Sequence, residues 1–378
     1  MKRKAVAILM SIALGAMAFT GCGTGNNEAA PEEVTAETEA EAETQTEAEE
    51  ESVTEEETAQ TEEKTETMEE ETTEEDTSYE SVEVKIGSLK GPTSMGLVYL
   101  MDQAEKGESA NQYEFTMAAG ADELLPSVIS GDLDIVLVPA NVASVLYNKT
   151  EGGVSVIDIN TLGVLYMVSG NADIKEMADL AGKTVYLTGK GTTPDYVTQY
   201  LLAENNLTDE VTLEYKSEAT EVAAMLVEDT DAIGVLPQPF VTAACAQNEN
   251  LSVVMDLTKE WAAIQGEGGS QLVTGVTVVR NDFLNENQAA VDKFLEEHKA
   301  SAAYANENVE EAAELVAAAG IMEKAAVAAK AMPNCNITYI DGTDMKTALS
   351  GYLEVLYNQD AGSVGGALPA EDFYYNAQ

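Results

Sequence analysis

A strand-like segment followed by a loop of glycine, proline and hydroxyl residues occurs twice, and this repetition is the feature that most constrains the fold. The first copy covers residues 84–97 (VKIGSLKGPTSMGL) and the second covers residues 184–195 (TVYLTGKGTTPD). In each copy a β-branched run leads into a loop that presents backbone N–H groups and hydroxyls where a helix begins. Each copy therefore predicts a strand, a loop and a helix in succession.

After each loop the sequence repeats the order of a strand, a helix and a third strand that ends in proline. Pro139 follows Gly91 by 48 positions, and Pro237 follows Gly191 by 46. Strands that alternate with helices in this way form sheets covered by helices on both faces. We expect an α/β fold of two Rossmann-like lobes, joined by two crossover segments, with a ligand cleft between the lobes.

The order of the expected elements sets the lobe boundaries. Lobe one is expected to contain residues 81–170 and 274–378, and lobe two residues 171–273, with hinges near 168–172 and 273–276. After the second crossover, segments rich in Ala, Glu and Lys with helical spacing of apolar residues predict helices that pack back on lobe one. These segments are residues 287–304, 309–319, 322–330 and 347–357.

The N-terminal segment carries an export signal. Basic residues at 2–4 precede an apolar run at 5–19 that is too short to span a bilayer comfortably. Residues 19–22 (FTGC) resemble a bacterial lipobox, with Phe at a position that is more often Leu. The resemblance implies that residues 1–22 form a lipoprotein signal peptide and that Cys22 is lipidated, which would anchor the protein on the extracytoplasmic face of the cell membrane. An ordinary secretion signal is the alternative.

Residues 23–80 are a low-complexity segment of Glu, Thr and Ala. They contain 24 acidic residues and a single lysine. Such a segment buries too little apolar surface to offset its ordering entropy, so we expect a disordered, extended linker between anchor and folded part. The alternative is that residues 23–80 form a tail that binds a partner.

Composition excludes some partners and leaves others open. The formal charge is −49, and the residues after the linker still hold 44 acidic against 15 basic residues, so nucleic acid is an improbable partner. Cys245 and Cys335 either pair, since export permits disulfides, or remain buried thiols. No Cys/His spacing indicates a metal site, and His298, the only histidine, is expected on an exposed helix face.

Four segments occur in a characteristic order and spacing: residues 91–97 (GPTSMGL), 131–141 (GDLDIVLVPAN), 179–185 (DLAGKTV) and 236–240 (LPQPF). Together they resemble the substrate-binding lipoproteins of ABC importers, in the branch linked with nitrate, sulfonate (taurine-like) and thiamine-precursor uptake. The resemblance covers roughly residues 82–378. It implies a periplasmic-binding-protein-like fold of type II that closes on a small molecule and delivers it to a membrane permease powered by a cytoplasmic ATPase.

The candidate binding residues lie at the strand ends that carry the repeated loops, where ligands of open α/β sheets are held. They are Gly91, Pro92, Thr93, Ser94, Met95, Asn141, Gly191, Thr192, Thr193 and Gln238. The alternative for the two loops is that they serve only to start helices. For Asn141 and Gln238 the alternative is that they serve only to form turns.

The ligand itself stays open between two classes. Helix N-termini with hydroxyls suit a small oxyanion such as a sulfonate or nitrate. Asp195, in the first turn of the lobe-two helix, would instead favour an amino-bearing heterocycle such as a pyrimidine, on which Tyr166, Tyr186 or Tyr196 would stack. Arg280 is the only arginine after the signal segment, so an arginine clamp on a carboxylate is improbable.

Two other functions compete with solute binding. Residues 189–194 only partly match a dinucleotide loop, and the sequence offers no nucleophile–base spacing, so we expect neither catalysis nor a cofactor. A surface-anchored sensor or adhesin with the same fold and no transport role is the second rival. No pattern indicates oligomerisation, and we expect a monomer.

Overall fold

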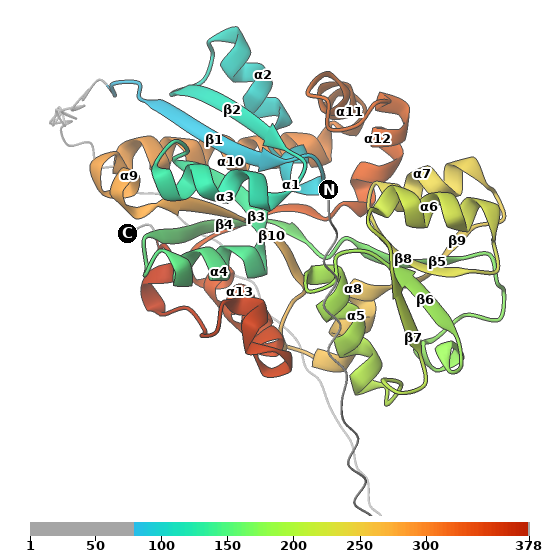
Figure 1. The fold of residues 1–378 in the computed structure, drawn as a ribbon. Coiled ribbons are helices and arrows are strands. Elements are labelled where there is room, and N and C mark those ends of the chain that lie inside the picture. The colour runs from blue at the N-terminus through green and yellow to red at the C-terminus, as the bar shows by residue number, and fades with distance from the viewer. Residues whose placement is uncertain (1–78, 377–378) are drawn as a thin grey trace, which may run out of the picture. The chain divides into compact units, whose positions relative to one another are not determined.

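Two β-sheets flanked by helices make up the part of the chain that the computed structural model describes, residues 79–376 (Figure 1). The expectations about the signal segment, Cys22 and nearly all of the acidic linker concern residues 1–78, which lie outside the described residues. The expected α/β fold with two sheets is confirmed.

Sheet A has six strands, and its central strands consist largely of buried apolar residues. Residues 135–138 of β3, for example, are all buried, as expected for a strand covered on both faces. β1 pairs parallel with β2 and β3, whereas β10 pairs antiparallel with β3 and β4. In spatial order the strands are β11 (Ile337–Ile340), β4 (Val154–Leu162), β10 (Val273–Arg280), β3 (Ile135–Pro139), β1 (Glu83–Leu89) and β2 (Gln112–Ala118).

Sheet B has five strands and repeats the plan of β1, β2 and β3. β6 pairs parallel with β7 and β8, while β5 runs antiparallel between β8 and β9. In spatial order the strands are β7 (Thr212–Tyr215), β6 (Thr184–Leu187), β8 (Ile233–Pro237), β5 (Leu165–Ser169) and β9 (Ser252–Asp256).

Helices cover both sheets and define the lobes (Figure 1). Lobe one, built on sheet A, contains α1 (Pro92–Met95), α2 (Val98–Lys106), α3 (Ala121–Ser130), α4 (Ala140–Lys149), α9 (Asn281–Glu286), α10 (Gln288–Glu307), α11 (Val309–Ala318), α12 (Ala325–Ala331) and α13 (Gly342–Gln359). Lobe two, built on sheet B, contains α5 (Thr193–Glu204), α6 (Ala219–Glu228), α7 (Phe240–Gln247) and α8 (Leu257–Gln265). Among the described helices, none is long and apolar enough to cross a membrane.

The chain crosses between the lobes twice. It leaves sheet A when β4 ends and enters sheet B with β5, so the first crossover is residues 163–164. This is earlier than the boundary at 170/171 expected from the sequence, because residues 165–169 already pair with β8 and β9. The chain returns through residues 266–272, between α8 and β10.

The crossovers fix which sheet edges face each other. Because β4 ends at the first crossover and β1 and β3 run parallel to it, their carboxyl ends face lobe two. In lobe two, β5 begins at the crossover, so β6, β8 and β9, which run opposite to it, end at the edge that faces lobe one. The loops after β1, β3, β6 and β8 therefore all meet at the seam between the lobes.

One prediction about the core was wrong. His298 of α10 is fully buried rather than exposed, and its Nδ1 lies 3.2 Å from Oδ2 of Asp158, also fully buried. α10 packs against α2 and β11, so the Glu- and Lys-rich pattern around this histidine marks only the outer face of the helix. The described cysteines are both free: Cys335 is buried and Cys245 half-buried.

Candidate functional site

The loop after β1 is held together by Ser94. Its hydroxyl donates to the Leu89 carbonyl and shares a hydrogen bond with the Ser88 hydroxyl. Ser94 and Met95 are both fully buried in lobe one. These two candidate residues therefore build the loop, and Ser94 has its hydroxyl already engaged there.

Thr93 is the residue of this loop whose polar atom remains available. Its hydroxyl is buried and has no hydrogen-bond partner among the described residues. A Cβ placed on Gly275, at the start of β10, would stand 2.6 Å from the Thr93 methyl. Thr93 therefore packs against β10, the strand with which the chain returns from lobe two. Gly91 and Pro92 precede it and are half-buried.

The loop after β6 is organised by Asp195. This buried carboxylate accepts hydrogen bonds from the Gly191 backbone N–H at 2.7 Å, from the Tyr215 hydroxyl at 2.6 Å and from the Gln199 amide. Burial and this carboxylate raise the pKa of Tyr215, so its phenol stays a donor. Both oxygens of Asp195 are therefore already hydrogen-bonded within lobe two.

Two other candidate residues in this loop are also used locally. The Thr192 hydroxyl donates to the Gly189 carbonyl at 2.6 Å, and Thr192 is the N-cap residue of α5. Gly191 has φ +76°, the left-handed region that favours glycine. The helix-start interpretation therefore accounts for the bonds that Gly191 and Thr192 make here.

Thr193 and Asn141 bring the two lobes into contact. The Thr193 hydroxyl of α5 lies 3.4 Å from Oδ1 of Asn141 in α4, and the Asn141 amide lies 3.4 Å from the Ser363 carbonyl. Both distances are at the long end of the hydrogen-bond range. The hydroxyls of Tyr352 and Ser363 are buried with no hydrogen bond of standard geometry, although Tyr352 lies beside Thr193. This seam cluster of Asn141, Thr193, Tyr352 and Ser363 holds unused hydrogen-bonding capacity.

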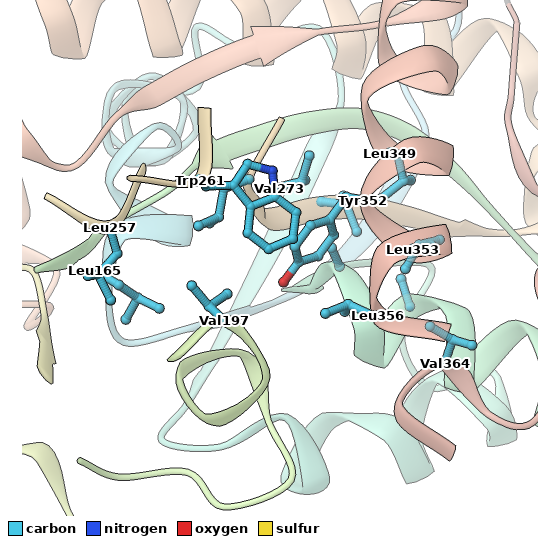
Figure 2. Close-up of a cluster of buried hydrophobic side chains, with 14 of the residues drawn as sticks. Leu165, Val197, Leu257, Trp261, Val273, Leu349, Tyr352, Leu353, Leu356 and Val364 are labelled. Atoms are coloured by element: carbon cyan, nitrogen blue, oxygen red, sulfur yellow. The ribbon is translucent and has the colours of Figure 1, made fainter. Parts of the chain in front are cut away.

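An apolar layer borders the seam cluster. Figure 2 shows Trp261 of α8 and Val197 of α5, both in lobe two, facing Tyr352 and Leu356 of α13 in lobe one. All four side chains are fully buried and belong to one continuous hydrophobic cluster that extends through both lobes. The two lobes are therefore closed on each other along this line.

Gln238 lies elsewhere on the seam, in a groove between α7 and α12 of about 470 Å³. The Tyr166 hydroxyl of β5 donates to the Asn334 carbonyl at 2.9 Å across this groove, so lobe two is bonded to lobe one here. The α7–α12 groove is lined by Tyr166, Gln238, Val241, Thr242, Cys245, Ala246, Val253, Asp256, Lys259, Lys330 and Asn334.

A further groove of about 550 Å³ runs between α5 and the end of α13. Gly191, Asp195 and Tyr196 line it, and the Tyr196 hydroxyl lies 3.5 Å from Asp360 of lobe one. Gly91 is not among its lining residues, so the two glycines of the repeated loops do not share this groove.

The structure thus divides the candidate residues. Asn141 and Thr193 lie together at the seam, Thr93 lies at the facing edge of sheet A, and Gln238 lines the α7–α12 groove. The sequence reasoning missed Tyr352, Ser363 and Lys330, which join the seam only because the C-terminal helices fold back on it. No local pattern marks these residues. The apolar spacing of Leu257, Trp261 and Ile264 is the one signal that could have revealed α8.

Comparison with known proteins places the chain in a family. The family model described as "Menaquinone biosynthesis" (VitK2_biosynth) matches residues 97–357. The chain belongs to this family. No curated protein sequence matches the chain.

Solved structures similar to this VitK2_biosynth member share its two-lobed fold. An ABC transporter structure from Parabacteroides distasonis is 23% identical, with a TM-score of 0.66, and the match covers 78% of this chain and 99% of that one. The periplasmic aliphatic sulphonate binding protein SsuA from Escherichia coli is 15% identical, with a TM-score of 0.61 and coverage of 74% and 93%. The ligand-binding component of an ABC-type import system from Staphylococcus aureus, with zinc bound, is 15% identical, with a TM-score of 0.60 and coverage of 79% and 97%. The expected periplasmic-binding-protein-like fold is confirmed.

Proposed function

We propose that this protein is the solute-binding component of an ABC uptake system, which captures a small molecule between its two lobes and delivers it to a membrane permease. The shared fold supports a binding role. The observation that carries the proposal is the set of buried hydroxyls of Thr93, Tyr352 and Ser363, all in lobe one, which make no hydrogen bond of standard geometry among the described residues. A buried polar group without a partner costs about 1–3 kcal/mol, and a polar solute supplies the missing bonds.

Closure follows from the positions of these residues. Thr193 moves with lobe two, whereas Asn141, Tyr352 and Thr93 move with lobe one, with residues 163–164 and 266–272 as hinges. A solute that bonds both sets stabilises the closed form over the open one by its differential affinity. The lobe-two loop, already rigid through Asp195, holds Thr193 in place for this contact.

A thermal-shift and native mass-spectrometry screen of the purified protein tests the proposal. Alkanesulfonates, nitrate and pyrimidines are the panel, and a bound solute raises the melting temperature by mass action. Replacing Thr193 with the longer Gln should weaken binding without unfolding the protein, whereas Thr220→Gln, an exposed position at the start of α6, should leave binding unchanged. Equal affinity in both variants would move the site away from the seam.

The family description refers to biosynthesis, so the same screen must separate binding from turnover. We expect mass spectrometry to recover every bound solute unchanged after long incubation. A new product that forms only with native protein would make the protein an enzyme and overturn a purely transporting role.

Lipid anchoring on the extracytoplasmic face of the membrane is part of this proposal. It rests on the lipobox-like residues 19–22. Cells expressing the full chain should retain it in the membrane fraction, and Cys22→Ser should release it. Retention of the Cys22→Ser protein would disprove anchoring through this residue.

A further inference from the structure

The first turn of α5 supplies the lobe-two part of the seam cluster, and it also contains a buried carboxylate. Thr193 is the first residue of α5, and its hydroxyl lies 3.4 Å from Oδ1 of Asn141 in lobe one. Asp195 follows two residues later in the same turn and is 3% exposed. A solute that bonds Thr193 is therefore held by the same helical turn that carries the negative charge of Asp195.

Asp195 supplies the negative charge that the N-terminus of α5 attracts. A helix N-terminus favours an anion through its free N–H groups and its dipole. In α5 the anion is the Asp195 carboxylate itself, which also accepts the Gly191 N–H at 2.7 Å. The second residue of the helix is Pro194, which has no N–H to offer. A second anion at this N-terminus would meet fewer donors and would be repelled by Asp195.

The seam cluster and Thr93 offer neutral groups that both donate and accept hydrogen bonds. The hydroxyls of Thr93, Tyr352 and Ser363 are buried and make no hydrogen bond of standard geometry among the described residues. A hydroxyl donates one hydrogen bond and accepts others, and the amide of Asn141 likewise has both a donor and an acceptor end. These groups are best satisfied by a solute that also carries both donors and acceptors.

The arginine and the lysines of the repeated loops do not give the seam cluster a positive charge. Arg280, the only arginine among residues 79–376, pairs with Asp134 at 3.1 Å, at the end of β10 away from the second crossover. Lys90 and Lys190 are exposed, and the Lys190 Nζ lies 5.2 Å from the centroid of the Tyr215 ring. An anion buried at the seam would therefore lose its hydration without gaining a counter-charge, which is costly.

We propose that Asp195 sets the charge selectivity of the seam, and that the solute is an uncharged molecule with several hydroxyl or amide groups. Anions are excluded by the Asp195 charge. Cations are not favoured either, because no carboxylate belongs to the seam cluster and both oxygens of Asp195 already accept hydrogen bonds within lobe two. The inference rests on the proposed solute-binding function and names the charge class of the solute and the residue that selects it.

Matched pairs of probes test the charge requirement. Uracil and orotate share a pyrimidine ring, gluconamide and gluconate share a hydroxylated chain, and ethanesulfonamide and ethanesulfonate share an alkyl group. Only the second member of each pair is an anion at pH 7. Calorimetric titration of the purified protein should show that, in each pair that binds, the uncharged member binds at least about tenfold more tightly. Glucamine, a cation of similar shape, should bind about tenfold more weakly than gluconamide.

Matched variants test the role of Asp195. Asp195→Asn keeps the shape of the side chain and removes its charge, so affinity for the anionic member of a pair should rise about tenfold relative to the uncharged member. Glu204→Gln removes a charge from the exposed C-terminal end of the same helix and should leave this ratio unchanged. Tyr215→Phe removes one hydrogen bond to Asp195 but keeps the charge, so a merely disturbed loop should retain the native ratio.

The outcomes separate the two proposals. If an anion binds more tightly than its uncharged partner and Thr193→Gln weakens that binding, solute binding stands and the charge selectivity is disproved. An unchanged ratio in folded Asp195→Asn protein disproves the role of Asp195. Should this variant not fold, the paired titrations of the native protein decide alone. If neither the pairs nor the screening panel yields a bound solute, both proposals fail.

Discussion

The rings of Trp261 and Tyr352 lie 5.5 Å apart between centroids, one contributed by each lobe. Trp261 is the only tryptophan of the chain, and its Nε1 donates to the Ser270 carbonyl at 3.0 Å in the second crossover. Opening the lobes must separate the two rings. The intrinsic fluorescence of this protein is therefore a direct reporter of lobe closure, and every binding experiment can be read through it.

Tyr352→Phe should separate stability from binding. The change removes a buried hydroxyl without a standard hydrogen bond but keeps the ring, so the unfolding free energy should stay level or rise by up to about 1 kcal/mol. If the hydroxyl contacts the solute, affinity falls. Tyr147→Phe is the control, because its hydroxyl donates to Asp372 at 2.5 Å and its loss should lower stability without changing affinity. Denaturant titration and calorimetry measure both, and a large stability loss in Tyr352→Phe would contradict the assignment.

The two glycines of the repeated loops should respond differently to alanine. Gly91 has φ 166°, an extended conformation that any residue adopts, and a Cβ there meets no atom within 4 Å. Gly191 has φ +76°, where a Cβ costs about 1–2 kcal/mol. Gly191→Ala should lower the melting temperature by several degrees while Gly91→Ala should not. Equal effects of the two changes would show that the loop conformations are alike after all.

Asp158→Asn tests the buried pair in lobe one. The Asp158 carboxylate faces two donors, the Thr277 hydroxyl at 2.9 Å and Nδ1 of His298. An asparagine keeps the shape but turns an NH2 group toward one of these donors, which should cost about 1–3 kcal/mol of unfolding free energy. Asp209→Asn, on the surface of lobe two, is the control and should be neutral. Unchanged stability in Asp158→Asn would show that the pair contributes nothing net.

Much of the fold follows from local patterns. Alternating β-branched runs and helical segments predicted two sheets, and the strand-ending prolines Pro139 and Pro237 lie at the ends of β3 and β8 as expected. Strand direction then brings the loops together, because parallel strands end at one edge of a sheet. The meeting of Asn141 with Thr193 at the seam needed only this reasoning.

The remainder depended on contacts that no local pattern encodes. His298 was misplaced because a helix can show charge on one face while another element covers its second face. Ser94 and Thr93 are neighbours with the same chemistry, yet only packing decides that the Ser94 hydroxyl bonds within its loop while the Thr93 hydroxyl has no partner among the described residues. Lys330 joins the groove through the return of the C-terminal helices, some 90 residues after Gln238 in the sequence.

Cys335 should make native stability fall with pH in the alkaline range. Burial raises the pKa of its thiol from an ordinary 9.0 to about 12. Between these values the unfolded thiol ionises while the folded one keeps its proton, so the unfolded state binds fewer protons and the unfolding free energy decreases as pH rises, by up to about 1.4 kcal/mol per pH unit. Below pH 9 this contribution is fully present and constant.

The variant Cys335→Ala should show a shallower decline of stability between pH 9 and 11 than the native protein, although it starts lower because it loses buried volume. Cys245→Ala is the control. Its thiol is only half-buried and lines the α7–α12 groove, so this change should alter the pH dependence of stability less than Cys335→Ala does. Urea titrations across this pH range give the slopes. In the same range Cys335 should resist N-ethylmaleimide until the protein unfolds, because the thiolate is the reactive species and the folded site keeps it scarce. Identical slopes for Cys335→Ala and the native protein would show that this thiol does not titrate with a raised pKa.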